Sequence, residues 1–460
     1  MPEPDPDKDP VTGRPWTFWK RVRRSLARRM PRTARAVNWT HAKVRHVAGR
    51  AWHRVRRVGW TVRWAWRQLQ ELRRLRRERR TTVAVDVTPF WEPLTGIGWY
   101  LYRTLEQLAS RDDLALRLYG PTAVDSPDRP GPVVPLPAGP AIEERLWAVP
   151  DDLAVPRGWV IRVLRRLEPV LLAVEGNRVL FAPNFFLPRR FAFARGRQVS
   201  TIHDLGVRKV PWTLQAETLD ALTARLERTA RRSRLLISVS GAVRDEIVDL
   251  GLATADKVRV VHHGPGQLAR VAPAAPPAGV PRHFALHVGT LEPRKNVLVL
   301  LDAWVRLRAS HPEAPALVLC GKYGWRSEEI AARVRSAEAE GWAVHPGYVS
   351  EEELAALYRR AALVVFPSLY EGFGLPAVEA QHAGTPLVCS DIPVLREVAG
   401  DGALFVAPED PSALARAVGE VLSDAALRDR LVESGRRSVA RLSWPDSAEA
   451  TAAVWLEAAR

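Results

Sequence analysis

The sequence is poor in cysteine and lacks long hydrophobic runs. Its 460 residues include two cysteines, Cys320 and Cys389, and each ends a short apolar run, ALVLC or PLVC. This pattern is typical of buried strand residues, so we expect free thiols and no disulfide. The longest apolar runs, such as residues 363–366, have the length of a strand and are too short to span a membrane. The acidic, proline-rich start MPEPDPDKDP is followed by no signal-peptide core, so we expect a cytoplasmic protein.

Metal-ligand clusters and lysines are scarce as well. No group of His, Cys, Asp or Glu has the spacing of a metal site, and no Asp-x-Asp pair ends a predicted strand. We therefore expect no metal and no other cofactor. Residues 81–460 contain only four lysines, at positions 209, 257, 295 and 322. A lysine within a motif of this region is therefore informative.

Positive charge is abundant but is confined to one segment. The net charge is +17, and residues 14–80 alone carry 23 Lys and Arg against two Glu. Residues 1–13 are slightly acidic, and the remaining 380 residues are close to neutral. The basic character thus belongs to an extension and does not indicate a nucleic-acid surface on the globular body.

The basic extension, residues 1–80, is predicted to be partly disordered and partly an amphipathic helix. Residues 14–80 hold seven of the 17 tryptophans, and apolar residues recur every three or four positions from Val44 to Leu69. A cationic helix that carries Trp favours the interface of an anionic membrane over a nucleic-acid-binding arm. A solvated charge run is the third alternative. The membrane alternative places the protein peripherally on the inner face of the membrane.

From Thr81 onward, predicted strands alternate with predicted helices. This alternation favours an α/β fold with doubly wound parallel sheets. A Pro- and Ala-rich stretch without periodicity separates two such series. We expect an N-terminal Rossmann-like domain over 81–265, a linker over 266–282 and a second Rossmann-like domain over 283–442, with a C-terminal helix over 443–460. Ligands of such sheets bind beyond the carboxyl ends of the strands, so the functional loops should follow strands.

Two loops of the second half carry the strongest chemical signal. GTLEPRKN, which begins at Gly289, follows a predicted strand and places Arg294 and Lys295 before a helix that Asn296 could cap, a position suited to a diphosphate. SLYEGFGLPAVEA, residues 368–380, also follows a predicted strand. Its glycines allow a ligand to approach the backbone closely, and Glu371 and Glu379 lie before and inside the next helix.

The first half carries a weaker signal. PLTGIGWY follows the first predicted strand, and its glycines Gly96 and Gly98 permit close backbone contact with a phosphate or sugar. His203 and Asp204 follow the predicted strand QVSTI in the same topological position. A histidine there could donate a hydrogen bond to a sugar hydroxyl, and a purely structural role is the alternative.

These motifs together resemble those of the family 4 glycosyltransferases, which have the GT-B fold. The resemblance covers residues 81–460 and is more specific in the second half. It rests on GTLEPRKN, on the E-x7-E element from Glu371 to Glu379 with GFGLP inside it, on IHDL at 202–205, on ISVSGAVRDEI at 237–247 and on CSDIPVLREVAGDGALFVAPED at 389–410.

The resemblance implies roles for individual residues. Arg294 and Lys295 would hold the donor diphosphate, Glu379 would bind the ribose, and Glu371 would hold the transferred sugar. His203 would approach from the N-terminal domain, and together with Glu371, Arg294 and Lys295 it is expected to act in catalysis. The other residues expected to contact the donor are Gly98, Gly289, Gly372, Phe373, Gly374 and Leu375.

The resemblance also implies an activity. We expect a retaining, metal-independent enzyme that moves a mannose-like hexose from a nucleotide sugar, a GDP-sugar before a UDP-sugar, to a glycan or lipid-linked acceptor in bacterial cell-envelope polysaccharide or glycolipid synthesis. One alternative is a sugar-nucleotide epimerase of the same fold. Another is a non-catalytic GT-B adaptor that binds membrane or nucleic acid through the basic extension.

Overall fold

The computed structural model describes Trp66, Gln70, residues 78–92, 94, 96–120, 132–144, 172, 175–188, 191, 197–266 and 271–460. The chain divides into two compact units, residues 1–74 with 149–165, and residues 75–148 with 166–460. The predicted amphipathic helix and its membrane contact fall in the first unit and lie almost entirely outside the described residues. All that follows concerns the second unit.

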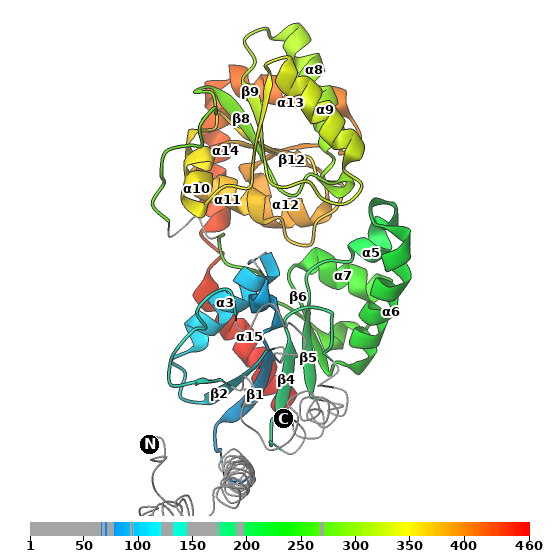
Figure 1. Ribbon diagram of the computed structural model, residues 1–460, viewed down its shortest axis with the longest axis vertical. Helices are drawn as coiled ribbons and strands as arrows, with labels where there is room; N and C mark the ends of the chain where they lie inside the picture. The colour runs from blue at the N-terminus through cyan, green and yellow to red at the C-terminus, as the bar shows by residue number, and fades with distance from the viewer. Residues whose placement is uncertain are drawn as a thin grey trace, which may run out of the picture. The chain divides into compact units, whose positions relative to one another are not determined.

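The second unit contains two parallel sheets (Figure 1). The first has seven strands in the order β3-β2-β1-β4-β5-β6-β7, and the second has six in the order β10-β9-β8-β11-β12-β13. Their bounds are β1 Thr81–Asp86, β2 Leu114–Tyr119, β3 Ile142–Glu144, β4 Val179–Ala182, β5 Gln198–Ile202, β6 Leu235–Ser238, β7 Val258–Val260, β8 Phe284–Val288, β9 Ala316–Cys320, β10 Ala343–Gly347, β11 Val364–Phe366, β12 Leu387–Ser390 and β13 Leu404–Val406.

Each sheet repeats the strand order of a Rossmann fold, in which the third, second and first strands are followed by the fourth, fifth and sixth. The chain therefore reverses direction across the sheet between β1 and β4, and again between β8 and β11. The predicted doubly wound GT-B architecture is confirmed. The sequence missed one element, β3, because three residues with two charges show no strand periodicity.

Helices cover both sheets. Those of the first half are α3 Gly96–Leu108, α5 Gly206–Lys209, α6 Ala216–Arg232 and α7 Gly241–Asp249. Those of the second half are α8 Val297–Ser310, α9 Glu328–Ala339, α10 Glu351–Arg360, α11 Leu375–Ala383, α12 Pro393–Ala399, α13 Pro411–Ser423, α14 Ala425–Val439 and α15 Trp444–Ala459. No helix in the described part of the chain is long and apolar enough to cross a membrane.

Alternate residues of the strands in the second sheet pack in two separate cores, one on each face of the sheet. Because both faces are buried, the sequences of these strands are continuous apolar runs. In β9, Leu317 and Leu319 pack with residues of α8, α9 and α13, whereas Val318 and Cys320 pack with residues of α10, α11 and α12. Cys389 of β12 lies in the second of these cores, and both cysteines are buried free thiols, as expected.

The last helix, α15, belongs to the first sheet by its packing. Figure 1 shows it in red beside α3, and it also contacts β1, β4, β5 and β6. Trp455 is fully buried there, with its ring centroid 4.9 Å from that of Phe181 on β4. The C-terminal end of the chain therefore completes the core of the N-terminal half.

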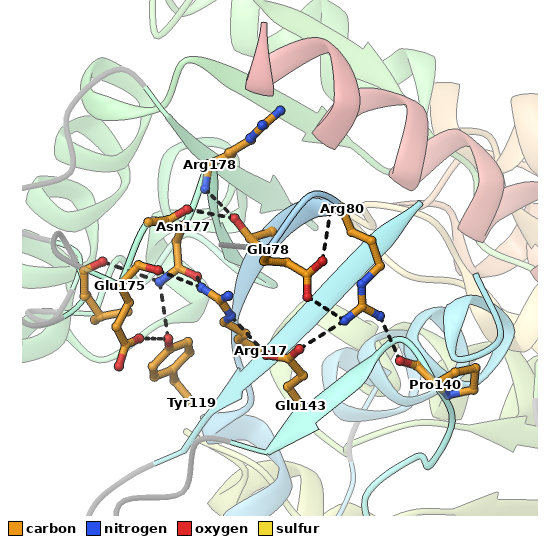
Figure 2. A network of polar contacts seen from close by, with 12 residues as sticks. Glu78, Arg80, Arg117, Tyr119, Pro140, Glu143, Glu175, Asn177 and Arg178 are labelled. Atoms are coloured by element: carbon orange, nitrogen blue, oxygen red, sulfur yellow. Dashed lines mark hydrogen bonds and ion pairs between the residues drawn. The ribbon is translucent and has the colours of Figure 1, made fainter. Parts of the chain in front are cut away.

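A network of buried charges lies at the amino ends of β1 and β4 (Figure 2). Arg117 of β2 is fully buried and donates to Glu143 Oε2 at 3.1 Å, to Asn177 Oδ1 at 3.0 Å and to the Glu175 carbonyl at 2.9 Å. Glu143 also pairs with Arg80, whose Nη2 lies 3.1 Å from Glu143 Oε1. Because these contacts join β2, β3 and the segments that precede β1 and β4, we interpret the network as structural.

Candidate functional site

The predicted functional loops follow strands at the two points where strand order reverses. Residues 289–296 follow β8, residues 368–374 follow β11, and the glycines at the start of α3 come after β1. The carboxyl ends of neighbouring strands diverge at such a point, which opens room for a ligand. The candidate site is therefore built from the loops where this fold binds ligands.

Arg294, Lys295 and Glu371 form a compact ion cluster at the reversal point of the second sheet. Lys295 Nζ donates to Glu371 Oε1, and Arg294 Nη1 lies 3.3 Å from Glu371 Oε2. Arg294 Nη2 also pairs with Glu292 at 2.8 Å. Lys295 is 8% exposed and Glu371 7% exposed, so most of their surface is removed from water. Charges this deeply buried require partners, and the cluster supplies them.

The charge of Glu371 is stabilised by its partners. Burial alone would raise the pKa of this carboxyl, but Lys295 and Arg294 outweigh burial and hold the pKa below its ordinary value. The group is therefore ionised at neutral pH. Glu371 and Glu292 together balance the two cations, so what the cluster offers an anionic ligand is the N–H donors of Arg294 and Lys295 and no net charge.

The helix that follows Glu371 begins without a side-chain cap. Gly374 occupies the N-cap position of α11 with φ of 94°, a left-handed conformation that favours glycine. Because glycine has no side chain, it makes no side-chain capping hydrogen bond. A Cβ at this position would also come within 2.6 Å of Leu395. Pro376 has no N–H and the Ala377 N–H donates to the Gly374 carbonyl at 2.9 Å, so the start of α11 offers a ligand beside Glu371 mainly the positive end of the helix dipole.

The other glycines of the site permit close packing of protein against protein. A Cβ at Gly372 would overlap the His203 carbonyl oxygen, and Ser240 Oγ donates to the Gly372 carbonyl at 2.8 Å. Gly289 has φ of 150°, and a Cβ there would come within 3.5 Å of the Lys295 side chain. Glycine is therefore required by loop packing at Gly372 and by the positive φ at Gly289.

Glu379 lies one turn into α11 and apart from the ion cluster. Tyr358 Oη donates to Glu379 Oε2 at 2.9 Å, and a Cβ at Gly266 would overlap Glu379 Oε1. Burial raises the pKa of Glu379 to about 7, opposed by the hydrogen bond from Tyr358 and reinforced by Glu351. This carboxyl therefore titrates in the physiological range.

The glycine segment of the first half does not present an open backbone at Gly98. Gly98 is buried in the first turn of α3, and a Cβ there would come within 2.7 Å of Leu94 Cδ2. Gly96, at the start of α3, lies next to Leu375, because its Cβ would be 3.9 Å from Leu375 Cδ1. The beginnings of α3 and α11 therefore lie close together.

His203 is held by the backbone. Its Nε2 donates to the Pro183 carbonyl at 2.7 Å, and burial lowers the pKa of the ring. In this neutral tautomer Nδ1 is an acceptor, so His203 would accept a hydrogen bond from a sugar hydroxyl instead of donating one as the sequence suggested.

The role expected of Asn296 needs revision. Asn296 stands at the N-cap position of α8 but does not cap it; its Nδ2 donates to the carbonyls of Pro367 and Pro408 instead, at 3.0 and 2.6 Å. These two hydrogen bonds join the loop after β8 to the loops after β11 and β13. The donor contact expected of Phe373 concerns its backbone, while its ring packs edge-on against His263, with centroids 4.9 Å apart.

Sequence reasoning missed several polar residues that connect the two halves. Glu397 of α12 accepts from the backbone N–H of Gly241 at 2.7 Å and of Ala242 at 2.9 Å, and His262 Nε2 lies 2.7 Å from it. Tyr370 Oη donates to Glu246 at 2.7 Å. The signal was present in part, since His262 and His263 follow β7 directly, the position that singled out His203. Nothing in the sequence pairs Glu397 with a helix start more than 150 residues away.

No group of three His, Cys, Asp or Glu side chains suited to a metal ion occurs among the residues that the structure describes. The positive groups available to an anion are Arg294, Lys295 and the uncapped start of α11. This arrangement can bind a diphosphate and stabilise negative charge on it.

Two family descriptions match the chain, one on each sheet. "Glycosyltransferase Family 4" matches residues 94–264, and "Glycosyl transferases group 1" matches residues 274–438. The second match contains the ion cluster and α11, and the first contains His203.

Similar proteins agree with these matches. The O-antigen chain mannosyltransferase B of Escherichia coli is 30% identical over 384 residues, which cover 77% of this chain and 94% of that protein. Sucrose-phosphate synthase from Thermosynechococcus elongatus has a similar fold, with a TM-score of 0.62 at 22% identity over 82% of this chain and 99% of that chain. Anabaena HepE in complex with UDP and glucose gives a TM-score of 0.59 at 16% identity over 82% and 99% of the respective chains. The chain therefore belongs to the family 4 glycosyltransferases and has their GT-B fold.

Proposed function

We propose that this glycosyltransferase moves a mannose-like hexose from a nucleotide diphosphate sugar, a GDP-sugar in preference to a UDP-sugar, to a glycan or lipid-linked acceptor of polysaccharide synthesis. The observation that carries the proposal is the ion cluster of Arg294, Lys295 and Glu371 beside the uncapped start of α11. The similarity to an O-antigen mannosyltransferase supports mannose as the sugar and a polysaccharide as the product.

The cluster supplies what a departing diphosphate requires. N–H donors and a helix dipole that are already oriented stabilise the charge that develops as the bond from the anomeric carbon to the phosphate oxygen breaks. Lys295 and Arg294 provide the donors, and Glu371 fixes their position. Because these groups stabilise the departing diphosphate, we propose transfer without a metal ion.

We propose retention of anomeric configuration. The acceptor hydroxyl approaches the face from which the diphosphate leaves, the new bond forms to the anomeric carbon, and the departing phosphate oxygen takes the hydroxyl proton. No protein side chain is then needed as a general base. Nuclear magnetic resonance of the glycoside formed reports the configuration of the new linkage, and an inverted linkage contradicts this mechanism.

The proposed activity is tested with purified protein, a panel of labelled GDP- and UDP-sugars, and a chelator in one arm. We expect a GDP-sugar to be hydrolysed slowly or transferred, with no loss in the chelator arm. The Lys295→Ala variant should lose about 10²- to 10³-fold in kcat/KM, because one fixed donor to the leaving group is removed.

Arg437→Ala is the matched control, because Arg437 lies exposed on α14 and its removal also takes away one positive charge. It should retain wild-type activity. The proposed chemistry is wrong, and the adaptor alternative is favoured, if the wild type neither binds nor hydrolyses any donor. The same follows if Lys295→Ala and Glu371→Ala both keep full activity. Conversion of the donor to another sugar nucleotide without an acceptor would favour the epimerase.

We propose in addition that residues 14–80 bring the enzyme to an anionic membrane surface. The support is the composition of this segment, with 23 Lys and Arg and seven Trp. Flotation with vesicles that contain phosphatidylglycerol should recover the full chain and lose a chain that lacks residues 1–77. Equal flotation of the two proteins contradicts the proposal.

A further inference from the structure

Two exposed tryptophans stand near the candidate site. Trp212 is 61% exposed and Trp325 is 46% exposed. Trp212 lies in a 3-10 turn, η3 Pro211–Thr213, which follows His203 and α5, and Trp325 lies in the loop after β9. Single exposed apolar residues are common on proteins, so exposure alone indicates nothing. Three further observations distinguish this pair.

Each of the two tryptophans lies in a turn that is held by a hydrogen bond of a buried neighbouring side chain. Next to Trp212, Thr213 is buried and its hydroxyl donates to the Val210 carbonyl at 2.7 Å. Close to Trp325, Ser327 is buried and its hydroxyl donates to the Gly324 carbonyl at 2.8 Å. The neighbours of each tryptophan are therefore anchored while the indole faces water. Preorganised aromatic rings of this kind bind a ligand at little cost in conformational entropy.

Arg326 connects the two turns. Its guanidinium Nη1 donates to the Trp212 carbonyl, although 114 residues separate them. Its φ of 53° is positive, and among the described residues the only other non-glycine residue with positive φ is Asn296, which lies next to Lys295. Strained backbone of this kind persists where the surrounding structure holds it, and it concentrates at functional sites.

Residues around both turns contact loops of the candidate site. Gly324 N–H donates to the Leu291 carbonyl at 3.0 Å, and a Cβ at Gly324 would come within 3.0 Å of Glu292 Cβ, whose carboxylate pairs with Arg294. On the side of Trp212, the Leu205 N–H donates to Tyr370 Oη at 2.9 Å, next to Glu371. The loop of Trp325 therefore contacts the loop that carries Arg294, and the segment that leads to Trp212 contacts the loop that carries Glu371.

We propose that Trp212 and Trp325 form a carbohydrate-binding subsite that holds sugar units of the acceptor glycan beside the reacting end. The apolar C–H face of a pyranose ring packs on an indole and leaves its hydroxyls in water, and the indole N–H can donate to one of them. The assignment of this ligand as the acceptor rests on the proposed glycosyl transfer.

Charge at the pair argues for a neutral glycan and against an anionic membrane. The cations that precede Trp212 already have partners: Arg208 lies 3.5 Å from Glu227 and Lys209 3.3 Å from Glu246. A membrane-binding surface of this size draws much of its affinity from unpaired basic groups around its tryptophans. A neutral sugar chain requires aromatic faces and hydrogen-bond partners but no net charge.

The test measures binding of an α-linked mannotetraose by NMR titration to the wild type and to Trp212→Ala, Trp325→Ala and the two Trp→Phe variants. Each alanine variant should bind the tetrasaccharide about tenfold more weakly or worse, the loss expected for one stacked ring face. The phenylalanine variants should retain part of the affinity, because they keep an aromatic face. Arg326→Gly, which accepts the positive φ but loses the guanidinium, should weaken binding as well.

Val305→Ala is the control, since Val305 is an exposed apolar residue on α8, 52% exposed. It should bind the tetrasaccharide as the wild type does. Hydrolysis of a labelled GDP-sugar in the absence of acceptor, measured on the same proteins, should be unchanged in all Trp variants. If the wild type turns over no donor, the proposed function fails, and the binding titration still decides whether the subsite exists.

Equal tetrasaccharide binding by the alanine variants and the wild type overturns the subsite, as does a wild type that binds no tetrasaccharide. Loss of vesicle binding in the alanine variants, with tetrasaccharide binding retained, overturns it in favour of a membrane contact.

Discussion

Burial makes the ionisation of Glu379 depend on whether the chain is folded. Burial raises the pKa of this carboxyl to about 7 from an ordinary value of 4.5. Between these two values the folded protein holds a proton that the unfolded chain releases, so this group makes the free energy of unfolding fall as pH rises from 4.5 to 7. Below 4.5 and above 7 its contribution is constant.

Binding of the nucleotide should show the opposite dependence on pH. If ribose hydroxyls donate to Glu379, the ionised carboxylate is the better acceptor. We expect GDP-mannose, whose phosphates do not titrate near neutrality, to bind about tenfold more weakly at pH 6 than at pH 8 by calorimetry, as a single titration near 7 requires. Glu379→Gln should remove this dependence. A wild-type affinity that is constant between pH 6 and 8 contradicts the assignment.

At the scale of elements, the edge of the first sheet depends on its buried charge network. Glu143 of β3 is an acidic partner of fully buried Arg117 of β2 (Figure 2). Glu143→Ala removes the carboxylate that lies 3.1 Å from the buried Arg117 guanidinium and should lower the free energy of unfolding by about 3 kcal/mol, measured by urea denaturation. Donor hydrolysis by the folded protein should be unaffected, because the network lies away from the site.

The control for this prediction is Glu449→Ala, which breaks an exposed pair with Arg111 of 2.5 Å. Ion pairs in water contribute little, so this change should cost less than about 1 kcal/mol. Equal destabilisation by the two variants contradicts the role of burial in the network.

The helices and strands were predictable from the sequence where residues close together in the chain determine them. Buried parallel strands read as apolar runs, and helices between them show their own period, so both sheets and the loops with Arg294 and Glu371 follow from pattern. The contact of Lys295 with Glu371 was not predictable, since the two residues were assigned to different parts of the donor. Nor was the hydrogen bond of His203 to Pro183, which reverses the expected role of its ring. Such contacts arise from the meeting of distant loops, which no local pattern encodes.

At the scale of the whole molecule, each sheet should depend for its stability on a different buried tryptophan. Trp455 of α15 comes from the C-terminal end of the sequence but packs in the core of the first sheet, whereas Trp304 of α8 packs in the core of the second. Both are fully buried. Replacement of either by alanine should cost about 3–5 kcal/mol, because a large cavity is left in a packed core.

The location of each loss can be measured by hydrogen exchange read peptide by peptide. Trp455→Ala should speed exchange in β1, β4, β5 and β6, which contact α15, and leave β8 and β9 protected. Trp304→Ala should do the reverse, with exchange faster in β8 and β9 and unchanged in the first sheet. If either variant loosens both sheets to the same degree, the molecule unfolds as one cooperative unit. The contacts that join its halves, such as those of Glu397 with the start of α7, would then be strong enough to couple the two cores.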